Sequence, residues 1–117
     1  AEYTVSRTYL DWLILVPCVP LVREWPDLSA IQQVQLQVEI NAAARALQQA
    51  FPHGEKLNIA ALGNVVPQLH IHVILRHAGD AAWPKPVWNE GVREPYSRES
   101  ALQALSAIMS CWDLSDD

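Results

Sequence analysis

The sequence lacks a long hydrophobic run and an excess of positive charge. Its longest apolar run, Trp12-Leu13-Ile14-Leu15-Val16, is far shorter than the ~20 residues of a membrane-spanning helix and stops at Pro17. We therefore expect no contact with a membrane, and no segment has the pattern of a signal peptide. The net charge of -5 repels a polyphosphate backbone, so we expect no binding to nucleic acid. Local donors can still hold a small phosphate ester.

Cysteine is also scarce. Cys18 and Cys111 lie far apart and form no CxxC motif, so we interpret them as reduced, partly buried thiols of a cytoplasmic protein. A single disulfide between them stays open as an alternative. A chain of 117 residues can build one hydrophobic core but not two. We expect a single domain over residues 1–117, and because the chain starts at Ala1 rather than Met we allow for a missing N-terminal piece.

The apolar pattern predicts a sheet packed by one long helix. Residues 3–16, 56–62 and 68–75 have the pattern of extended strands. No Gly or Pro interrupts residues 30–50, where good helix formers dominate, and Asp27 or Ser29 suits the N-cap. Residues 79–95 contain several prolines and predict an irregular segment, after which a second helix starts near Ser97.

Two adjacent apolar stripes run along the long predicted helix. One consists of Leu36, Ile40, Ala43 and Leu47, and the other of Ile31, Val34 and Val38. The first stripe can pack on the sheet. The second leaves room for a partner subunit, although a wide core face is the simpler explanation.

Two histidines alternate with aliphatic residues in the third predicted strand. Because successive side chains of a strand point to opposite faces, Gln68, His70 and His72 share one face. The opposite face is purely aliphatic, and we expect it to be buried against the long helix. A strand face with two imidazoles and an amide is unusual for a purely structural strand, so we interpret it as a functional site.

Two chemistries fit this pair of histidines. A His-x-His strand can present two ligands to zinc, but the candidates for a third ligand are poor. His77 has the opposite parity, and His53 lies at the end of the long helix, so we leave both out of the site. Alternatively, a neutral imidazole, with an unperturbed pKa of ~6.5, can attack phosphorus and form a covalent intermediate. We favour this second chemistry.

The segment Gln68-Leu69-His70-Ile71-His72-Val73-Ile74 resembles the histidine triad (HIT) signature, His-x-His-x-His with apolar residues between, here with Gln in the first position. Residues 56–67 are similar to the strand and phosphate loop of that family. Residues 80–84 are similar to its Trp-Pro segment, and residues 9–29 to a strand and a helix start. The resemblance covers residues 9–96 and is closest to a bacterial branch with Gln in the first position.

The resemblance implies an α+β, HIT-like fold, with a mainly antiparallel sheet packed by the long helix and a C-terminal helix. It implies that His70 is the nucleophile that becomes nucleotidylated and that His72 contacts the phosphate. Gln68 replaces a histidine that orients its neighbours. The implied activity is hydrolysis or transfer at a nucleotide phosphate, of a dinucleoside polyphosphate or a nucleoside phosphoramidate, by a homodimer. We expect no obligatory redox or organic cofactor and assign no metal ligand to the site, and a dependence on divalent metal stays open.

For substrate binding the resemblance implies Asn64 in the phosphate loop, Asn58 near the ribose and phosphate, and Trp83 as a lining residue. We interpret Trp88 as a packing residue and Arg76 as a solvated charge. Two alternatives to the enzyme stay open. One is a non-catalytic nucleotide-binding module, in which Gln68 marks lost activity, and the other is a metal-binding protein that uses His70 and His72.

Overall fold

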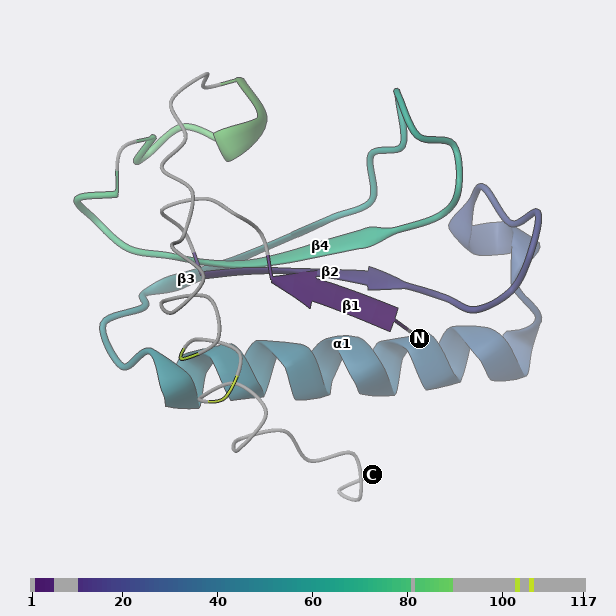
Figure 1. The fold of residues 1–117 in the computed structure, drawn as a ribbon, viewed down its shortest axis with the longest axis horizontal. Coiled ribbons are helices and arrows are strands. Elements are labelled where there is room, and N and C mark those ends of the chain that lie inside the picture. Colours follow the sequence, from purple (N-terminus) through teal and green to yellow (C-terminus); the bar gives the residue numbers. More distant parts are fainter. Residues whose placement is uncertain (1, 6–10, 81, 90–102, 104–105, 107–117) are drawn as a thin grey trace.

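The computed structural model describes residues 2–5, 11–80, 82–89, 103 and 106. Within these residues, a sheet of four strands is covered on one face by a single long helix (Figure 1). The elements are β1 (Glu2–Val5), β2 (Asp11–Val16), α1 (Ala30–Ala50), β3 (Lys56–Ala60) and β4 (Ile71–Arg76). The strand order is β1-β2-β4-β3, and each neighbouring pair is antiparallel. The predicted α+β fold is confirmed, while the helix expected near Ser97 falls outside the described residues apart from positions 103 and 106.

The first predicted strand, residues 3–16, is divided into two strands in the structure. β1 pairs antiparallel with β2, and Tyr3 lies opposite Leu15. The single extended segment was therefore a wrong prediction. An apolar run shows that a segment is extended, but it does not show where the chain reverses direction.

α1 spans the predicted residues because its N-terminus is capped by local hydrogen bonds. The Ser29 backbone N–H donates to Gln32 Oε1 at 2.8 Å, and the Gln32 backbone N–H donates to Ser29 Oγ at 3.2 Å. This reciprocal pair satisfies donors that the first turn of a helix leaves free. The helix ends at Ala50, directly before Phe51 and Pro52, as predicted.

Only one of the two apolar stripes of α1 packs on the sheet. The first stripe is buried as predicted and consists of Leu36, Ile40, Ala43 and Leu47. In the second stripe, Ile31 is 72% exposed and Val34 is 61% exposed. A wide core face was therefore the wrong explanation, because the sheet contacts only one side of the helix.

β4 separates two hydrophobic clusters. Leu69, Ile71, Val73 and Leu75 are buried with α1 and with Leu13 and Leu15 of β2, which confirms the predicted aliphatic face. On the opposite face of the sheet, Trp12 and Ile74 pack with Ala82 and Val87. That second face also carries His72, which lies between these strands and the loop that follows β4.

The ladder of β4 begins later than predicted, at Ile71 rather than Gln68. The Leu69 backbone N–H donates to Val22 O at 2.8 Å, and the Gln68 Nε2 donates to Val19 O at 3.4 Å. Gln68 and Leu69 therefore bind to the connection that follows β2 and not to a neighbouring strand. β3 likewise ends at Ala60, so no ladder partner is available from it at this point.

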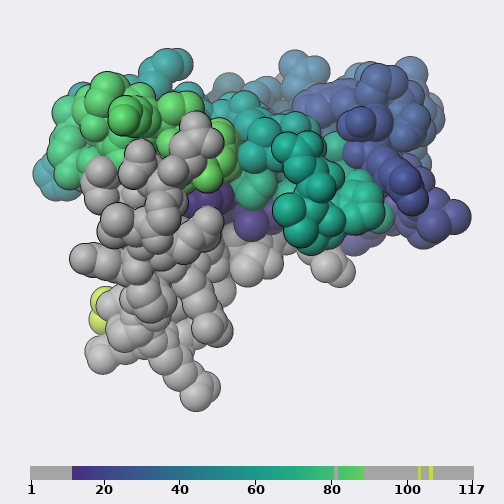
Figure 2. All heavy atoms as spheres, turned by 90° about the horizontal axis from the view of Figure 1, so that it is seen from above, coloured from purple at the N-terminus to yellow at the C-terminus, as the bar shows by residue number. Residues whose placement is uncertain are grey.

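Two loops rise from the face of the sheet opposite α1. Residues 61–70 join β3 to β4, and residues 77–89 follow β4 and contain the short 3-10 helix η2 (Val87–Asn89) (Figure 1). Figure 2 looks onto this side of the molecule, with the green residues of the second loop at one end and the teal residues of the first loop in the middle. Both loops thus stand beside the strand that carries His72.

Two further predictions concern membranes and cysteine. Among the helices that the structure describes, none combines the length and the apolar character that a membrane crossing requires. Cys18 is a free thiol and is exposed rather than partly buried. Its position directly after Pro17, outside the sheet, explains the exposure, and Cys111 lies outside the described residues.

Candidate functional site

His70 is half-buried and is held by the backbone two residues before it. Its Nδ1 lies 2.7 Å from Gln68 O. A carbonyl oxygen can only accept, so Nδ1 of His70 carries the hydrogen and donates. In the neutral ring, the second nitrogen, Nε2, is therefore left with an unshared electron pair.

His72 lies in β4 with its ring close to that of His70. The two ring centroids are 5.1 Å apart, and the rings are inclined by 71°. Trp12 Nε1 lies 3.0 Å from His72 Nδ1, and the Trp88 ring lies edge-on to the imidazole with the centroids 5.0 Å apart. His72 is therefore enclosed by three rings from three segments of the chain.

The pairing of β2 with β4 brings Trp12 to His72. Ile14 lies opposite His72 and Trp12 lies opposite Ile74. Side chains that are diagonal neighbours on one face of a sheet come within reach of each other when one is aromatic. The indole therefore reaches the imidazole across the strand pair.

The surroundings of His72 favour its neutral form. Burial, and secondly the charge of nearby His70, lower the pKa of His72 from 6.5 to about 4. Burial disfavours the charged imidazolium because it removes hydrating water. His72 is therefore neutral at pH 7.

Arg76 is buried on the same face of β4, so its interpretation as a solvated charge was wrong. It is 1% exposed and makes a bidentate pair with Asp80, at 2.8 Å from Nε to Oδ2 and 2.9 Å from Nη2 to Oδ1. Arg76 Nη1 also donates to Asn58 Oδ1 at 3.0 Å, and the guanidinium lies 5.6 Å from the centroid of the Trp83 ring. A buried guanidinium needs such partners because it has lost its water.

Asp80 fastens the loop after β4 to the sheet. Besides Arg76, its Oδ1 accepts hydrogen bonds from the backbone N–H groups of Ala82 at 3.2 Å and Trp83 at 2.8 Å. Burial alone would raise the pKa of Asp80, but the hydrogen bonds from Arg76 and from backbone donors, together with the positive charge of Arg76, lower it overall. The carboxylate therefore stays ionised and keeps the loop that carries Trp88 against the site.

The structure brings His70 and His72 together but distributes the other predicted residues around them. The side-chain amide of Gln68 is turned to Val19 O, so that Gln68 meets His70 through its backbone carbonyl. Asn58 is half-buried beside Arg76, and Asn64 is exposed in a bend of the first loop. Trp83 is 36% exposed and covers Arg76. Contacts of Asn58, Asn64 and Trp83 with a substrate stay predictions.

Sequence reasoning missed Trp12 and Trp88 as neighbours of His72. Trp12 was interpreted as part of an apolar strand, and Trp88 as a packing residue. One signal was available, because an indole N–H in a buried apolar run needs an acceptor. Which acceptor it finds depends on the register of β2 against β4, and this register is not readable from local patterns.

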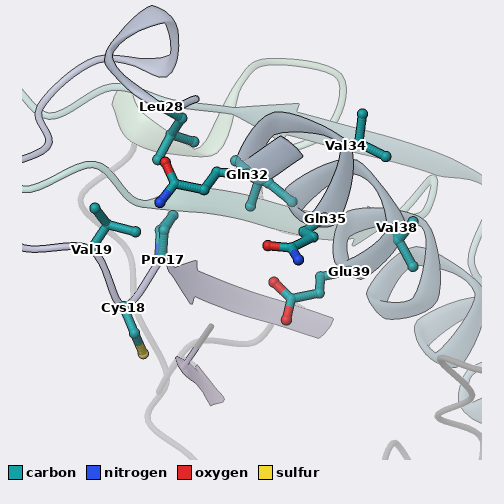
Figure 3. Close-up of a pocket in the computed structure, with 10 residues that line it drawn as sticks. Pro17, Cys18, Val19, Leu28, Gln32, Val34, Gln35, Val38 and Glu39 are labelled. Carbon is teal, nitrogen blue, oxygen red and sulfur yellow. The ribbon is translucent and has the colours of Figure 1, made fainter. Parts of the chain in front are cut away.

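A cavity of about 660 Å³ lies elsewhere, between α1 and the connection that follows β2 (Figure 3). Its lining includes Cys18, Val19, Gln32 and Glu39, and none of the predicted site residues. Leu36, which packs on the helix side of the sheet, also lines it. This cavity is therefore separate from the histidine pair.

The structure gives little support to a metal site. Within the described parts of the chain, no group of three or more His, Cys, Asp and Glu side chains is arranged to hold a metal ion. The Nδ1 atoms of His70 and His72 are both engaged by protein groups. A structural zinc site uses four ligands, so the two histidines alone do not form one.

The sheet, its covering helix and the paired histidines agree with a known family. The sequence model of the HIT domain family matches residues 6–79, and the chain belongs to this family. None of the curated proteins compared with the chain matches it.

Three solved structures are similar to this chain over more than nine tenths of its length. A histidine triad protein from Bradyrhizobium japonicum is 42% identical, with a TM-score of 0.90 over 96% of this chain and 84% of that one. A histidine triad (HIT) protein from Sinorhizobium meliloti 1021 is 41% identical, with a TM-score of 0.87 over 91% of this chain and 78% of that one. A histidine triad protein from Marinobacter aquaeolei VT8 is 38% identical, with a TM-score of 0.87 over 94% of this chain and 80% of that one. Membership in this family indicates nucleotide binding, or hydrolase or transferase activity.

Proposed function

We propose that this protein is a nucleotide hydrolase or transferase that acts through a nucleotidyl adduct on His70. The observation that best supports this proposal is the 2.7 Å hydrogen bond from His70 Nδ1 to Gln68 O. It holds the ring in one orientation and leaves the Nε2 electron pair available for attack. A nucleophilic histidine needs both properties.

The proposed reaction has two steps. The Nε2 electron pair of His70 forms a bond to the α-phosphorus, and the bond from that phosphorus to the leaving group breaks. The leaving group is a phosphate oxygen of a dinucleoside polyphosphate or the nitrogen of a nucleoside phosphoramidate, and it takes the bonding electrons and a proton. Water or another acceptor then breaks the nitrogen–phosphorus bond and restores His70. No electrons are lost or gained, so the route uses no redox or organic cofactor.

The other site residues take supporting roles in this proposal. His72, with its ring centroid 5.1 Å from that of His70, contacts the phosphate. We place Asn64, Asn58 and Trp83 around the rest of the nucleotide. Each lies on β3 or on one of the two loops that stand beside the histidines.

Gln68 in the first triad position, as in a bacterial branch of the family, is compatible with catalysis in this arrangement. Its contact with His70 uses the backbone carbonyl, which every residue has. Replacing Gln68 with His should therefore leave the orientation of His70 unchanged. The rate of adduct formation should then change by less than about tenfold, which is less than the loss of a general acid or base causes.

We also propose a homodimer in the cytoplasm. Ile31 and Val34 on the second stripe of α1 are exposed, and so are Ile59 of the edge strand β3 and Leu62 in the loop that follows it. Unpaired edge strands and exposed apolar stripes are surfaces that a second copy can cover. The free thiol of Cys18 suits a reducing compartment. Sedimentation of the purified protein tests the dimer directly.

Mass spectrometry of the intact protein tests the adduct. The protein is mixed with an adenosine phosphoramidate or a diadenosine polyphosphate, quenched within milliseconds to seconds, and kept at alkaline pH to preserve the phosphorus–nitrogen bond. The wild type should gain the mass of one nucleotidyl group on His70, and His70→Ala should gain none. His53→Ala is the matched control, because His53 is exposed after α1, outside the site.

Two results would contradict the proposal. Binding of the nucleotide without an adduct or turnover indicates a non-catalytic nucleotide-binding module. Stoichiometric zinc that survives dialysis against a chelator, and is lost in His70→Ala and His72→Ala, indicates a metal-binding protein.

A further inference from the structure

The hydrogen bond between Trp12 and His72 has a defined direction. Trp12 Nε1 and His72 Nδ1 are 3.0 Å apart. The indole nitrogen always carries its hydrogen and has no electron pair to accept with, so Trp12 donates and His72 Nδ1 accepts. A histidine whose Nδ1 accepts a hydrogen bond carries its hydrogen on Nε2.

We propose that Trp12 is a positioning residue that holds His72 as the neutral Nε2–H tautomer, so that His72 acts as a hydrogen-bond donor and not as a base. Trp12 is buried in a cluster with Ile74 and Val87, which keeps its indole in place. Its ring is edge-on to the imidazole at 5.5 Å between the centroids. The packing of β2 against β4 and η2 thus determines which nitrogen of His72 carries the hydrogen.

This arrangement makes the two imidazoles complementary. The Gln68 carbonyl leaves His70 with a bare Nε2 electron pair, and the Trp12 indole leaves His72 with an Nε2–H group. One ring can attack phosphorus while the other donates a hydrogen bond to a phosphoryl oxygen. These catalytic roles of the two rings rest on the proposed function, whereas the tautomer of His72 does not.

His72 can donate its Nε2–H hydrogen bond as a neutral ring, without being protonated to an imidazolium. The rings that contact His72 in the described structure belong to His70 on the same segment, Trp12 of β2 and Trp88 of η2, and of these only the His70 ring is an ionisable group. Protonation of His72 would require Nδ1 to give up the Trp12 hydrogen bond. This cost adds to burial and to the charge of His70, which lower the pKa of His72 to about 4.

Long-range proton–nitrogen correlation spectra of the ¹⁵N-histidine-labelled protein test the tautomer without any substrate. In the wild type, His72 should show the Nε2–H pattern alone from neutral pH down to the onset of its protonation. In Trp12→Phe, which keeps a ring but removes the N–H group, the Nδ1–H tautomer should become detectable. The pKa of His72 should rise by about one, since a neutral hydrogen bond contributes about a tenfold change in an equilibrium constant.

Trp88→Phe is the matched control. It removes an indole that lies as close to His72, with centroids 5.0 Å apart, but leaves the Trp12 hydrogen bond intact. His72 should keep its single Nε2–H tautomer in this variant. Equal changes in the two variants would show that ring packing, and not the hydrogen bond, sets the state of His72.

The wild-type spectrum decides the proposal even if Trp12→Phe does not fold. An Nδ1–H pattern for His72 at neutral pH overturns it. If the tautomer is as stated but no adduct forms on His70, the proposed function fails while the role of Trp12 as the tautomer-setting residue stands. If the adduct forms, Trp12→Phe should lower kcat and move the acid limb of the pH–rate profile to higher pH, with little change in KM.

Discussion

Replacing Asp80 with Ala removes one partner of a buried ion pair and should strongly destabilise the protein. The Asp80 side chain is fully buried and that of Arg76 is 1% exposed. In Asp80→Ala, the guanidinium keeps the Asn58 oxygen and the Trp83 ring but loses both charge-assisted hydrogen bonds. Water cannot replace these bonds without opening the loop that follows β4.

The expected cost is large compared with the stability of a domain of this size. Removing one partner of a buried pair costs about 3–5 kcal/mol, because the other charge stays buried without compensation. The backbone N–H groups of Ala82 and Trp83 also lose their acceptor, although such terms do not simply add. Since the free energy of unfolding of a domain is only about 5–15 kcal/mol, we expect the melting temperature to fall by about 10–20 °C.

Urea unfolding at pH 7, followed by tryptophan fluorescence and circular dichroism, measures this cost. Asp27→Ala is the control, because Asp27 is an exposed carboxylate that accepts one backbone hydrogen bond from Glu24 at 3.1 Å. It should cost about 1 kcal/mol or less. The double variant Arg76→Met/Asp80→Ala should be more stable than Asp80→Ala alone, because it no longer buries an unpaired charge.

Two outcomes would refute this reasoning. If Asp80→Ala lowers the free energy of unfolding no more than Asp27→Ala does, the ion pair does not hold the loop after β4 to the sheet. If the double variant is no more stable than the single one, the loss comes from the backbone hydrogen bonds and not from the unpaired guanidinium.

Further predictions concern α1 and His72. Leu47→Ala truncates a fully buried side chain and should cost about 2–5 kcal/mol in urea unfolding, whereas Val34→Ala on the exposed stripe should cost less than about 0.5 kcal/mol when the protein is dilute enough to be monomeric. Ser29→Ala removes the N-cap acceptor of Gln32 and should cost about 1 kcal/mol, and an unchanged urea midpoint would contradict the role of the cap. The pKa of His72 is lowered from 6.5 to about 4, so between these pH values the unfolded chain binds a proton that the folded protein does not. Stability should therefore fall as the pH drops from about 6.5 to 4, and His72→Gln should flatten this dependence.

Local patterns were sufficient to predict α1. Its uninterrupted run of helix formers, the Ser29 cap and the buried stripe that contains Leu36 and Leu47 are all found where the sequence placed them. Each depends on residues within one or two turns of one another. The alternation around His70 and His72 was predictable for the same reason, because the period of a strand is local.

The ends of the strands were not predictable from local patterns. β4 starts at Ile71 because Gln68 and Leu69 bind to Val19 and Val22, which lie about fifty residues earlier in the chain. The burial of Arg76 likewise depends on a loop that folds back over the sheet. A single charged residue at the end of an apolar strand gives no sign of that loop.

The sequence alone determined the helix, the aliphatic and histidine-bearing faces of the strand, and the family to which they belong. The tertiary structure decided which residues surround the histidines, because only the antiparallel register of β2 with β4 brings Trp12 to His72. These two residues are sixty positions apart, and a shift of one residue in that register would turn Trp12 to the opposite face of the sheet. Long-range pairing, and not residue composition, therefore completes the site.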